Sequence, residues 1–238
     1  MSHVHVFEPL ETWTQGGLWY CDLSKPPNDE SLSMLSNPER ARAQRFLREP
    51  DRHSFIGAHV ALRKLLAAQL AQAPEALAFA TGPFGKPFLD GHEPLRFNLS
   101  HSHSVALVAL SRHCEVGVDI EKIRDLPDAD DLVQRHFSAH EQQAWGLLSE
   151  PHRPAAFYRA WSRKEACVKA LGWGLSMPLE TVEVGLEPGL RQLELSLPEG
   201  GLAQVSVLSL SLEAGWSGAV AWVRQALGND PEVSESCQ

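Results

Sequence analysis

Acidic and apolar side chains alternate in the stretch EVGVDIEKIR, residues 115–124, near the middle of the chain. On a β-strand, successive side chains face opposite sides, so Asp119 and Glu121 project from one face, roughly 7 Å apart. If that face lies in a buried cleft, the two carboxylates need a shared cation or a raised pKa. On its own, the alternation is more typical of a half-solvated antiparallel strand. The apolar residues of the other parity, which we expect to anchor the strand in the core, are Val116, Val118 and Ile120.

A third carboxylate lies on a predicted long helix with the sequence FYRAWSRKEACVKALGWG. Trp161, Glu165 and Lys169 recur every four residues there, so they share one helix face. An exposed Glu–Lys pair of this spacing is common and contributes about 0.3–0.5 kcal/mol. The alternative is that Glu165 joins Asp119 and Glu121 in one site, with Lys169 one turn further along the same groove.

Three carboxylates without paired histidine or cysteine ligands form a hard oxygen site, which favours Mg²⁺ or Mn²⁺ over zinc. Mg²⁺ takes few protein ligands and completes its shell with water and substrate phosphates, so a diphosphate substrate fits such a site. Catalysis would then depend on positioning, on neutralising the charge of the transferred phosphoryl group, and on one base for the nucleophile.

Two further segments place polar groups at expected turns. In SHSHS, residues 100–104, His101 can be a metal ligand with His103, a phosphate contact or a polar turn residue, and an HxH pair alone is weak evidence for a metal. The loop GPFGKP, residues 82–87, contains two glycines and two prolines. We expect this rigid loop to present Lys86 as an exposed cation in a fixed place.

The net charge of -9 excludes nucleic acid as the main partner, because binding to a phosphate backbone needs a basic footprint. Basic residues nevertheless outnumber acidic ones by seven to three between residues 37 and 64. Such a patch suits a small polyanion or an acidic protein partner, but it is equally compatible with a solvated helix face. The basic residues are Arg40, Arg42, Arg45, Arg48, Arg52, Arg63 and Lys64.

Periodicity and capping signals predict the elements that must position these groups. The expected helices cover residues 37–47 (capped by Asn37), 52–70 (capped by Asp51), 131–137, a helix begun by a capping box at Ser138 and Glu141, and 154–171. The expected strands cover residues 4–7, 18–23, 77–81, 95–99, 105–111, 115–124 (as a third strand of the group 95–111), 182–184, 192–197, 204–210 and 219–223.

The order strands, helices, strands occurs twice, so we expect an α+β fold with two similar halves and the active site in the cleft between them. The halves would be residues 1–112 and 113–228, followed by a disordered tail at 229–238. At 238 residues and 43% hydrophobic content, the chain has the composition of a globular protein. The absence of a signal segment or a long apolar run predicts a cytoplasmic protein without membrane contact. The four cysteines lack CxxC spacing and predict free thiols.

Three of these segments, FNLSHSHS (97–104), GVDIEKIR (117–124) and WSRKEACVKALGWGL (161–175), resemble the signatures of the 4′-phosphopantetheinyl transferases of the surfactin-synthetase-activating (Sfp) type. The stretch NPERARAQRF and the GKP loop also match that family in order and placement. The resemblance covers residues 37–175. Each motif alone is moderately specific, whereas all five in order are highly specific.

The resemblance implies that coenzyme A donates its 4′-phosphopantetheine arm to a serine hydroxyl of an apo carrier protein, with release of adenosine 3′,5′-bisphosphate. The partners would be acyl, peptidyl or aryl carrier domains of fatty-acid, polyketide, peptide or siderophore assembly. The resemblance also implies Mg²⁺ dependence, two pseudo-symmetric α/β halves and a monomer.

The family's residue roles carry over to matching positions of this chain. The implied metal ligands are Asp119, Glu121 and Glu165. The implied catalytic residues are Glu165 as the base, directly or through water, Lys169 as the cation that steadies the phosphate or protonates the leaving group, and His101. The implied coenzyme A contacts are Ser100, His101 and Lys169 at the phosphates, Lys86 at the nucleotide end, and Arg40, Arg42 and Arg52 or His53 near the 3′-phosphate.

Two other functions are compatible with the same residues. One is a non-catalytic module that binds coenzyme A or a carrier protein, and the other is a Mg²⁺-dependent phosphohydrolase. Because no carboxylate of the trio is missing, the sequence favours an active enzyme.

Overall fold

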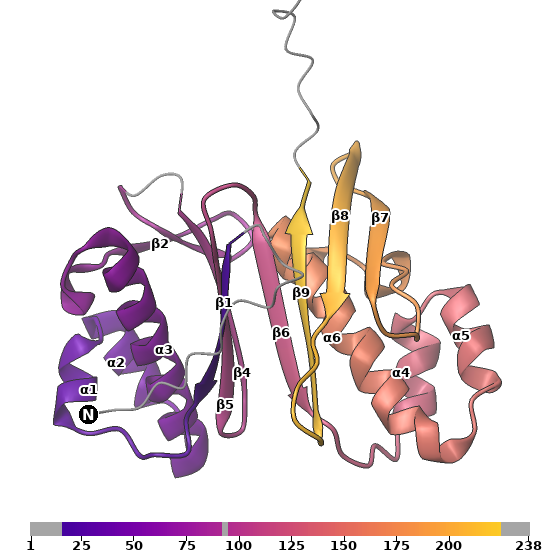
Figure 1. Cartoon of the computed structure of the whole chain (residues 1–238), viewed down its shortest axis with the longest axis horizontal. Coiled ribbons are helices and arrows are strands. Elements are labelled where there is room, and N and C mark those ends of the chain that lie inside the picture. The colour runs from indigo at the N-terminus through magenta and orange to yellow at the C-terminus, as the bar shows by residue number, and fades with distance from the viewer. Residues whose placement is uncertain (1–15, 92–94, 225–238) are drawn as a thin grey trace, which may run out of the picture.

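The computed structural model of the chain describes residues 16–91 and 95–224. Within them, two β-sheets lie next to each other, and helices cover the outer side of each sheet (Figure 1). The mixed α+β class is therefore confirmed. The predicted strand at 4–7, the predicted disordered tail at 229–238 and Cys237 lie outside the described residues.

The first sheet is antiparallel with strand order β1–β5–β4. Its strands are β1 (Gly17–Asp22), β4 (Arg96–Ser102) and β5 (Val105–Ser111). Strand β5 is buried along its whole length because alternate residues pack in different directions. Ala106, Val108 and Leu110 join the core under the N-terminal helices, whereas Val105 and Leu107 join the core between the two sheets.

The helices of the N-terminal part are α1 (Asp29–Met34), α2 (Asn37–Ala43) and α3 (Glu49–Leu70), followed by a 3₁₀ turn, η1 (Pro74–Ala76), and the hairpin β2 (Phe79–Thr81) and β3 (Pro87–Leu89). Two predicted caps are wrong by a few residues. Ser36, not Asn37, caps α2 and forms a capping box with Glu39. Helix α3 begins at Glu49 and includes Asp51 in its first turn, because Pro50 is compatible with the first helical turn.

The second sheet is antiparallel with strand order β6–β9–β8–β7. Its strands are β6 (Val116–Lys122), β7 (Leu190–Ser196), β8 (Leu202–Ser209) and β9 (Trp216–Val223). The prediction that the 115–124 strand extends the sheet of 95–111 is wrong, because β6 forms its ladder with β9 from the end of the chain. It still lies beside β4, where Val118 N donates to Asn98 Oδ1 at 2.9 Å.

The C-terminal helices are α4 (Ala129–His136), α5 (Ala139–Gly146) and α6 (Arg153–Leu171), and short 3₁₀ turns occur at η2 (Glu150–His152), η3 (Gly174–Ser176) and η4 (Leu179–Thr181). The predicted capping box of Ser138 and Glu141 is confirmed at the start of α5. The predicted end of α6 is also confirmed, since Gly172 terminates it in the left-handed conformation at φ 77°. Helix α6 packs across β6, β9 and β8.

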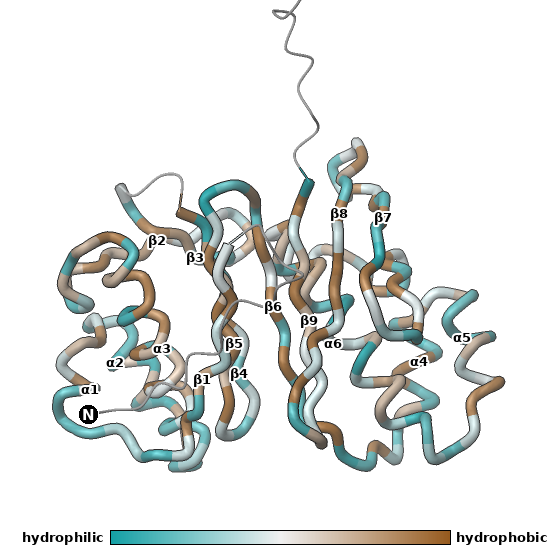
Figure 2. Tube along the Cα trace, in the orientation of Figure 1, coloured by the Kyte–Doolittle hydropathy of each residue, from teal (hydrophilic) through white to brown (hydrophobic). Residues whose placement is uncertain are grey.

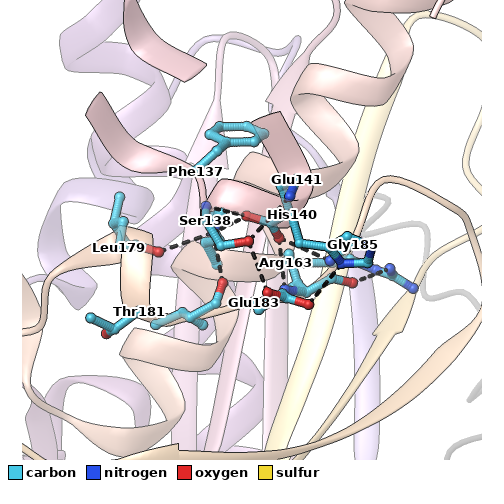
Figure 3. Close-up of polar contacts among 12 residues, drawn as sticks. Phe137, Ser138, His140, Glu141, Arg163, Leu179, Thr181, Glu183 and Gly185 are labelled. Carbon is cyan, nitrogen blue, oxygen red and sulfur yellow. Dashed lines mark hydrogen bonds and ion pairs between the residues drawn. The ribbon is translucent and has the colours of Figure 1, made fainter. Parts of the chain in front are cut away.

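The strand predicted at residues 182–184 is wrong. Charged side chains, not a neighbouring strand, satisfy its backbone groups (Figure 3). Glu141 Oε1 accepts from the backbone N–H groups of Val184 and Gly185, at 2.8 and 2.9 Å. Lys164 Nζ donates to the carbonyl oxygen of Val182 at 2.6 Å. These contacts fasten the segment to α5 and α6.

Hydrophobic residues concentrate along the central strands and the inner sides of the helices, whereas the connecting loops are mostly hydrophilic (Figure 2). As predicted, Val116, Val118 and Ile120 are buried, and they form the core between the sheets with residues of β1, β5 and β9. No helix in the described part of the chain is long and apolar enough to cross a membrane.

Candidate active site

Strand β4 is longer than predicted, and this extension shapes the site. Residues 100–102 continue the ladder with β5, so the expected turn is confined to His103 and Ser104. Because side chains alternate along a strand, Ser100 and Ser102 face one way and His101 the other. The serines contact β6, and His101 contacts α3.

Three elements converge on the Asp119 carboxylate. Its Oδ1 accepts from Ser100 Oγ of β4 at 2.9 Å and from Lys169 Nζ of α6 at 2.6 Å. Lys169 Nζ also lies 3.3 Å from Ser100 Oγ. The other oxygen, Asp119 Oδ2, is buried and has no hydrogen-bond partner among the described residues. A buried carboxylate oxygen without a partner is costly, which is typical of a binding site.

Gly117 allows α6 to lie directly on β6. A Cβ at this position would overlap the carbonyl oxygen of Ala166 and the backbone nitrogen of Ala170. The space beside Gly117 is filled by the backbone of α6. This close approach brings Glu165 and Lys169 to the strand that carries Asp119 and Glu121.

The two glutamates sit in an environment that opposes their ionisation. Burial raises the pKa of Glu121, and the negative charge of Asp119 raises it further, against the opposing hydrogen bond from Ser102 Oγ at 3.2 Å. Burial also raises the pKa of Glu165, and Lys169 opposes this effect while Asp119 adds to it. The Asp119 carboxylate therefore acts electrostatically on both glutamates, which is consistent with one shared site.

Lys169 is the cation that faces these acids. Burial lowers the pKa of its ammonium group, but Asp119, Glu165 and Glu121 together outweigh burial, so the pKa is raised. Its side chain is 29% exposed, which leaves it accessible to a ligand as well as to Asp119.

The carboxylates fit a hard divalent cation in their donor chemistry. Among the described residues, no group of three or more His, Cys, Asp or Glu side chains is already close enough to enclose a metal. Asp119 Oδ2, which has no partner among these residues, is however an available oxygen ligand, and burial, with a smaller contribution from Asp119, raises the pKa values of Glu121 and Glu165, so a nearby cation would favour their ionised forms. Side-chain movements would be needed to complete the shell.

A cavity of about 990 Å³ opens beside this cluster, between the start of α3, the β4–β5 turn and the end of β6. Glu121, His101 and His53, which were predicted as site residues, all line it. Burial lowers the pKa of His101 to about 4, and the nearby His59, Lys169 and Arg42 lower it as well, so His101 is neutral near pH 7. The remaining basic residues that line the cavity are Arg48, His103, Lys122 and Arg124.

Lys86 is not the exposed cation that the loop composition predicts. Its Nζ donates to Glu115 Oε2 at 2.7 Å, to Ala170 O at 2.9 Å and to Val116 O at 3.2 Å. The side chain is 17% exposed because the long methylene stem reaches the carboxylate and the backbone at the end of α6. It lines a different cavity of about 530 Å³, which also contains Phe84 stacked on Trp173.

The predicted arginines occupy three different situations. Arg40 donates to the carbonyl oxygens of Leu32 and Leu35, so it ties α2 to α1. The Arg42 guanidinium lies over the Phe55 ring, 5.2 Å from its centroid. Arg52 is exposed in the first turns of α3. Of these three, none lines the 990 Å³ cavity within the described ranges.

Sequence reasoning missed two residues that contact the predicted site residues. Ser102 binds Glu121, and Ser54 Oγ lies 3.1 Å from His101 Nδ1. The available signal was a single serine within the apolar stripe of α3, next to the buried Phe55. The composition of SHSHS predicts a turn at Ser102, which hides the strand parity that directs its side chain to Glu121.

Two family models match the chain in succession. The model of the 4′-phosphopantetheinyl transferase superfamily matches residues 115–221, and that of the 4′-phosphopantetheinyl transferase N-terminal region matches residues 24–113. The slr0495 protein of Synechocystis sp. is 37% identical over 170 residues, which cover 71% of this chain and 69% of the relative.

Two further relatives carry the name of the activity. The 4′-phosphopantetheinyl transferase HetI of Nostoc sp. is 34% identical over 176 residues (72% of this chain, 74% of the relative). The 4′-phosphopantetheinyl transferase Sfp of Bacillus subtilis is 29% identical over 177 residues (74% and 77%). The matches span the site described above, and the chain therefore belongs to the 4′-phosphopantetheinyl transferase superfamily.

Proposed function

We propose that this protein transfers the 4′-phosphopantetheine arm of coenzyme A to a serine hydroxyl of apo carrier proteins, and that the site around Asp119 performs the transfer. The observation that carries this proposal is the convergence of Ser100, Asp119 and Lys169, where one buried Asp119 oxygen has no partner among the described residues. The cavity beside them is lined by both basic and acidic side chains. Such an arrangement suits a cation and a diphosphate together.

Asp119, Glu121 and Glu165 would hold Mg²⁺, with Mn²⁺ as a second suitable ion. The bound cation would neutralise charge on the diphosphate and orient it. Lys169 adds a positive charge on the same side, since it already contacts Asp119. His101 would donate to a phosphate oxygen from one face of β4, and Ser100, on the other face, would do so only after it exchanges its hydrogen bond to Asp119.

The transfer itself is a displacement at phosphorus. The serine oxygen of the carrier forms a bond to the phosphorus that bears the pantetheine arm, and the bond from that phosphorus to the bridging oxygen breaks. Adenosine 3′,5′-bisphosphate leaves with the bridging oxygen. Glu165 takes the serine proton, directly or through water, and its raised pKa favours this base function. Lys169 stabilises the charge on the departing phosphate or protonates it.

We assign coenzyme A nucleotide binding to residues 1–112 and the metal site to residues 113–228. His53 lines the 990 Å³ cavity, and Arg40, Arg42 and Arg52 belong to the neighbouring helices α2 and α3. In this assignment, Lys86 holds the nucleotide end only after it exchanges its contact with Glu115 for the ligand.

An acidic carrier would dock beside this cavity. Arg45 and Arg48 are exposed on either side of Leu47, whose side chain is fully exposed in the turn between α2 and α3. An apolar residue between two cations matches a partner with an acidic rim. Arg45→Glu with Arg48→Glu should raise KM for the carrier and leave KM for coenzyme A nearly unchanged, and an unaltered carrier KM would refute this docking surface.

Mass spectrometry tests the proposed function directly. An apo carrier protein incubated with this protein, coenzyme A and Mg²⁺ should gain one phosphopantetheine group, and omission of Mg²⁺ should abolish the gain. Hydrolysis of coenzyme A without a carrier would indicate a phosphohydrolase instead. We also propose that the protein acts as a cytoplasmic monomer, which sedimentation and cell fractionation would check.

A further inference from the structure

The first turns of α3 and the end of β4 are joined by a contact between Ser54 and His101. Ser54 Oγ lies 3.1 Å from His101 Nδ1, and both residues line the 990 Å³ cavity. Ser54 is 6% exposed, although it is a polar residue within an otherwise apolar helix face. A buried hydroxyl in this position needs a partner, and the histidine ring supplies it.

Because His101 is neutral, its contact with Ser54 influences which ring nitrogen carries the hydrogen. A neutral imidazole has one N–H donor and one acceptor nitrogen, and the hydrogen bond made by one nitrogen determines the role of the other. Burial and the positive charges of His59, Lys169 and Arg42 hold the pKa of His101 at about 4. His101 therefore offers a ligand either one N–H donor or one lone pair, and an anionic oxygen tolerates only the donor.

The direction of the hydrogen bond follows from the surroundings of Ser54. A helical serine can also donate to the carbonyl oxygen one turn earlier, but within residues 16–91 and 95–224 the Ser54 hydroxyl has His101 Nδ1 as its one hydrogen-bond partner. If the hydroxyl donates to Nδ1, its hydrogen is satisfied and the ring hydrogen lies on Nε2, whereas acceptance from Nδ1–H would leave the hydroxyl hydrogen without a partner in these residues. Nε2 is also the nitrogen left for a ligand, because Nδ1 is engaged with α3.

We infer that Ser54 is a positioning residue, which fixes the ring orientation of His101 and its Nε2–H tautomer so that His101 presents a donor to the phosphate oxygens of coenzyme A. This inference rests on the proposed function for the identity of the ligand. The contact with Ser54 makes the donor available before binding, so no binding energy is spent on selecting it.

Nitrogen-15 NMR of the imidazole rings in the full chain tests the tautomer without any turnover. We expect wild-type His101 to show an Nε2–H donor and an unprotonated Nδ1 near pH 7. Ser54→Thr should preserve this pattern because it keeps the hydroxyl, whereas Ser54→Ala should populate a second tautomer or ring orientation. A wild-type Nδ1–H tautomer would overturn the inference.

Steady-state kinetics tests whether Ser54 contributes to coenzyme A binding through His101. If the competent form of His101 falls to between a third and a tenth of the molecules, Ser54→Ala should raise KM for coenzyme A about 3- to 10-fold with little change in kcat, and Ser54→Thr should restore it. In a His101→Ala background, Ser54→Ala should have no further effect, because Ser54 acts through His101. An effect of equal size in that background would overturn the inference.

Ser149→Ala provides a matched control, because Ser149 Oγ makes the same type of contact with His152 Nδ1, at 2.9 Å, on an exposed surface. The Ser149→Ala variant should keep the wild-type KM for coenzyme A and the wild-type kcat. If the wild-type protein transfers no phosphopantetheine, the proposed function fails, whereas normal transfer with an unchanged KM in Ser54→Ala refutes only the role of Ser54. The NMR experiment on the wild type is decisive even if Ser54→Ala does not fold.

Discussion

Helix α6 carries two buried lysine–carboxylate pairs, five residues apart, that differ in how completely they are satisfied. Lys164 binds Glu141, and both side chains are almost fully buried, at 0% and 1% exposure. Lys169 binds Asp119 at the same distance of 2.6 Å, but its own side chain is 29% exposed. One helix therefore carries a lysine–carboxylate pair that is fully buried and another whose lysine is partly exposed.

The Lys164 pair is complete. Glu141 accepts from the backbone of Ser138, Val184 and Gly185 as well as from Lys164. Lys164 also donates to the carbonyl oxygens of residues 179 and 182 (Figure 3). Asp119, in contrast, keeps one oxygen without a partner among the described residues. The first pair is therefore satisfied within the fold, and the second has the open oxygen that the proposed ligand site requires.

The largest effect should come from Glu141→Ala. Its removal leaves the Lys164 ammonium buried without a counter-charge and removes an acceptor from three backbone N–H groups, so the free energy of unfolding should fall by about 3–5 kcal/mol. Urea denaturation measures this. Glu183→Ala breaks an exposed pair with His140 and should cost at most about 1 kcal/mol. Equal losses of unfolding free energy in the two variants would contradict the structural role of the buried Lys164–Glu141 pair.

Asp119→Ala should strongly reduce the transfer rate but change the unfolding free energy little. The transfer rate should fall about 10²- to 10³-fold, comparable to the loss of a main electrostatic group in other enzymes, or roughly 2.7–4 kcal/mol. The unfolding free energy should change by less than about 2 kcal/mol, because an unpartnered buried oxygen disappears and Lys169 can reach Glu165, Glu121 or water. Steady-state transfer assays and urea denaturation measure the two effects. A destabilisation as large as that of Glu141→Ala would show that Asp119 is structural.

Glu39 extends the comparison to the N-terminal half. Burial opposes its ionisation, but hydrogen bonds from His59, Arg63 and Ser36 outweigh it and lower its pKa to about 2. A carboxylate with a lowered folded-state pKa stabilises the protein above its unfolded pKa of 4.5, and this contribution disappears as the pH falls toward about 2. Glu39→Gln should therefore cost at most about 3 kcal/mol at pH 7 and little near pH 2. If the unfolding free energies of wild type and Glu39→Gln change in parallel between about pH 2 and pH 7, the lowered pKa of Glu39 is contradicted.

Gly117→Ala should give a smaller effect on both properties. The added methyl group overlaps the backbone of α6, so we expect a loss of about 1–3 kcal/mol in unfolding free energy, with reduced transfer because Glu165 and Lys169 shift. The control is Gly146→Ala at the end of α5, where a Cβ meets open space. That substitution should stabilise by about 0.4–1 kcal/mol. Similar melting temperatures for the two variants would argue against the close approach at Gly117.

The sequence alone predicted the local elements of the fold well. Alternation in residues 115–124 identified the buried and acidic faces of β6, and the capping box identified the start of α5. The pairing of β6 with β9 was not predictable, because it depends on a strand about 100 residues later in the chain. The end of β4 also differs from the prediction, because its pairing with β5, not the turn-like sequence SHSHS, decides where the strand ends.

Motifs predicted that Ser100, Asp119 and Lys169 lie together, whereas the partners of other charged residues were not predictable. Sequence patterns place charges on surfaces, but Lys86, Arg63 and Lys164 turn inward to carboxylates and backbone carbonyls. Residues 182–184 have the alternation of a strand, with two valines around a glutamate, but charged side chains bind their backbone groups instead. Ser54 gave almost no signal, since its importance depends on which strand residue faces α3.

The most direct test compares wild type, Asp119→Ala and Glu183→Ala by mass spectrometry of an apo carrier protein with coenzyme A and Mg²⁺. We predict one added phosphopantetheine group with wild type and with Glu183→Ala, and almost none with Asp119→Ala at the same enzyme concentration. The absence of a gain with wild type across several apo carriers, or an equal gain with Asp119→Ala, would contradict the assignment of phosphopantetheine transfer to this site.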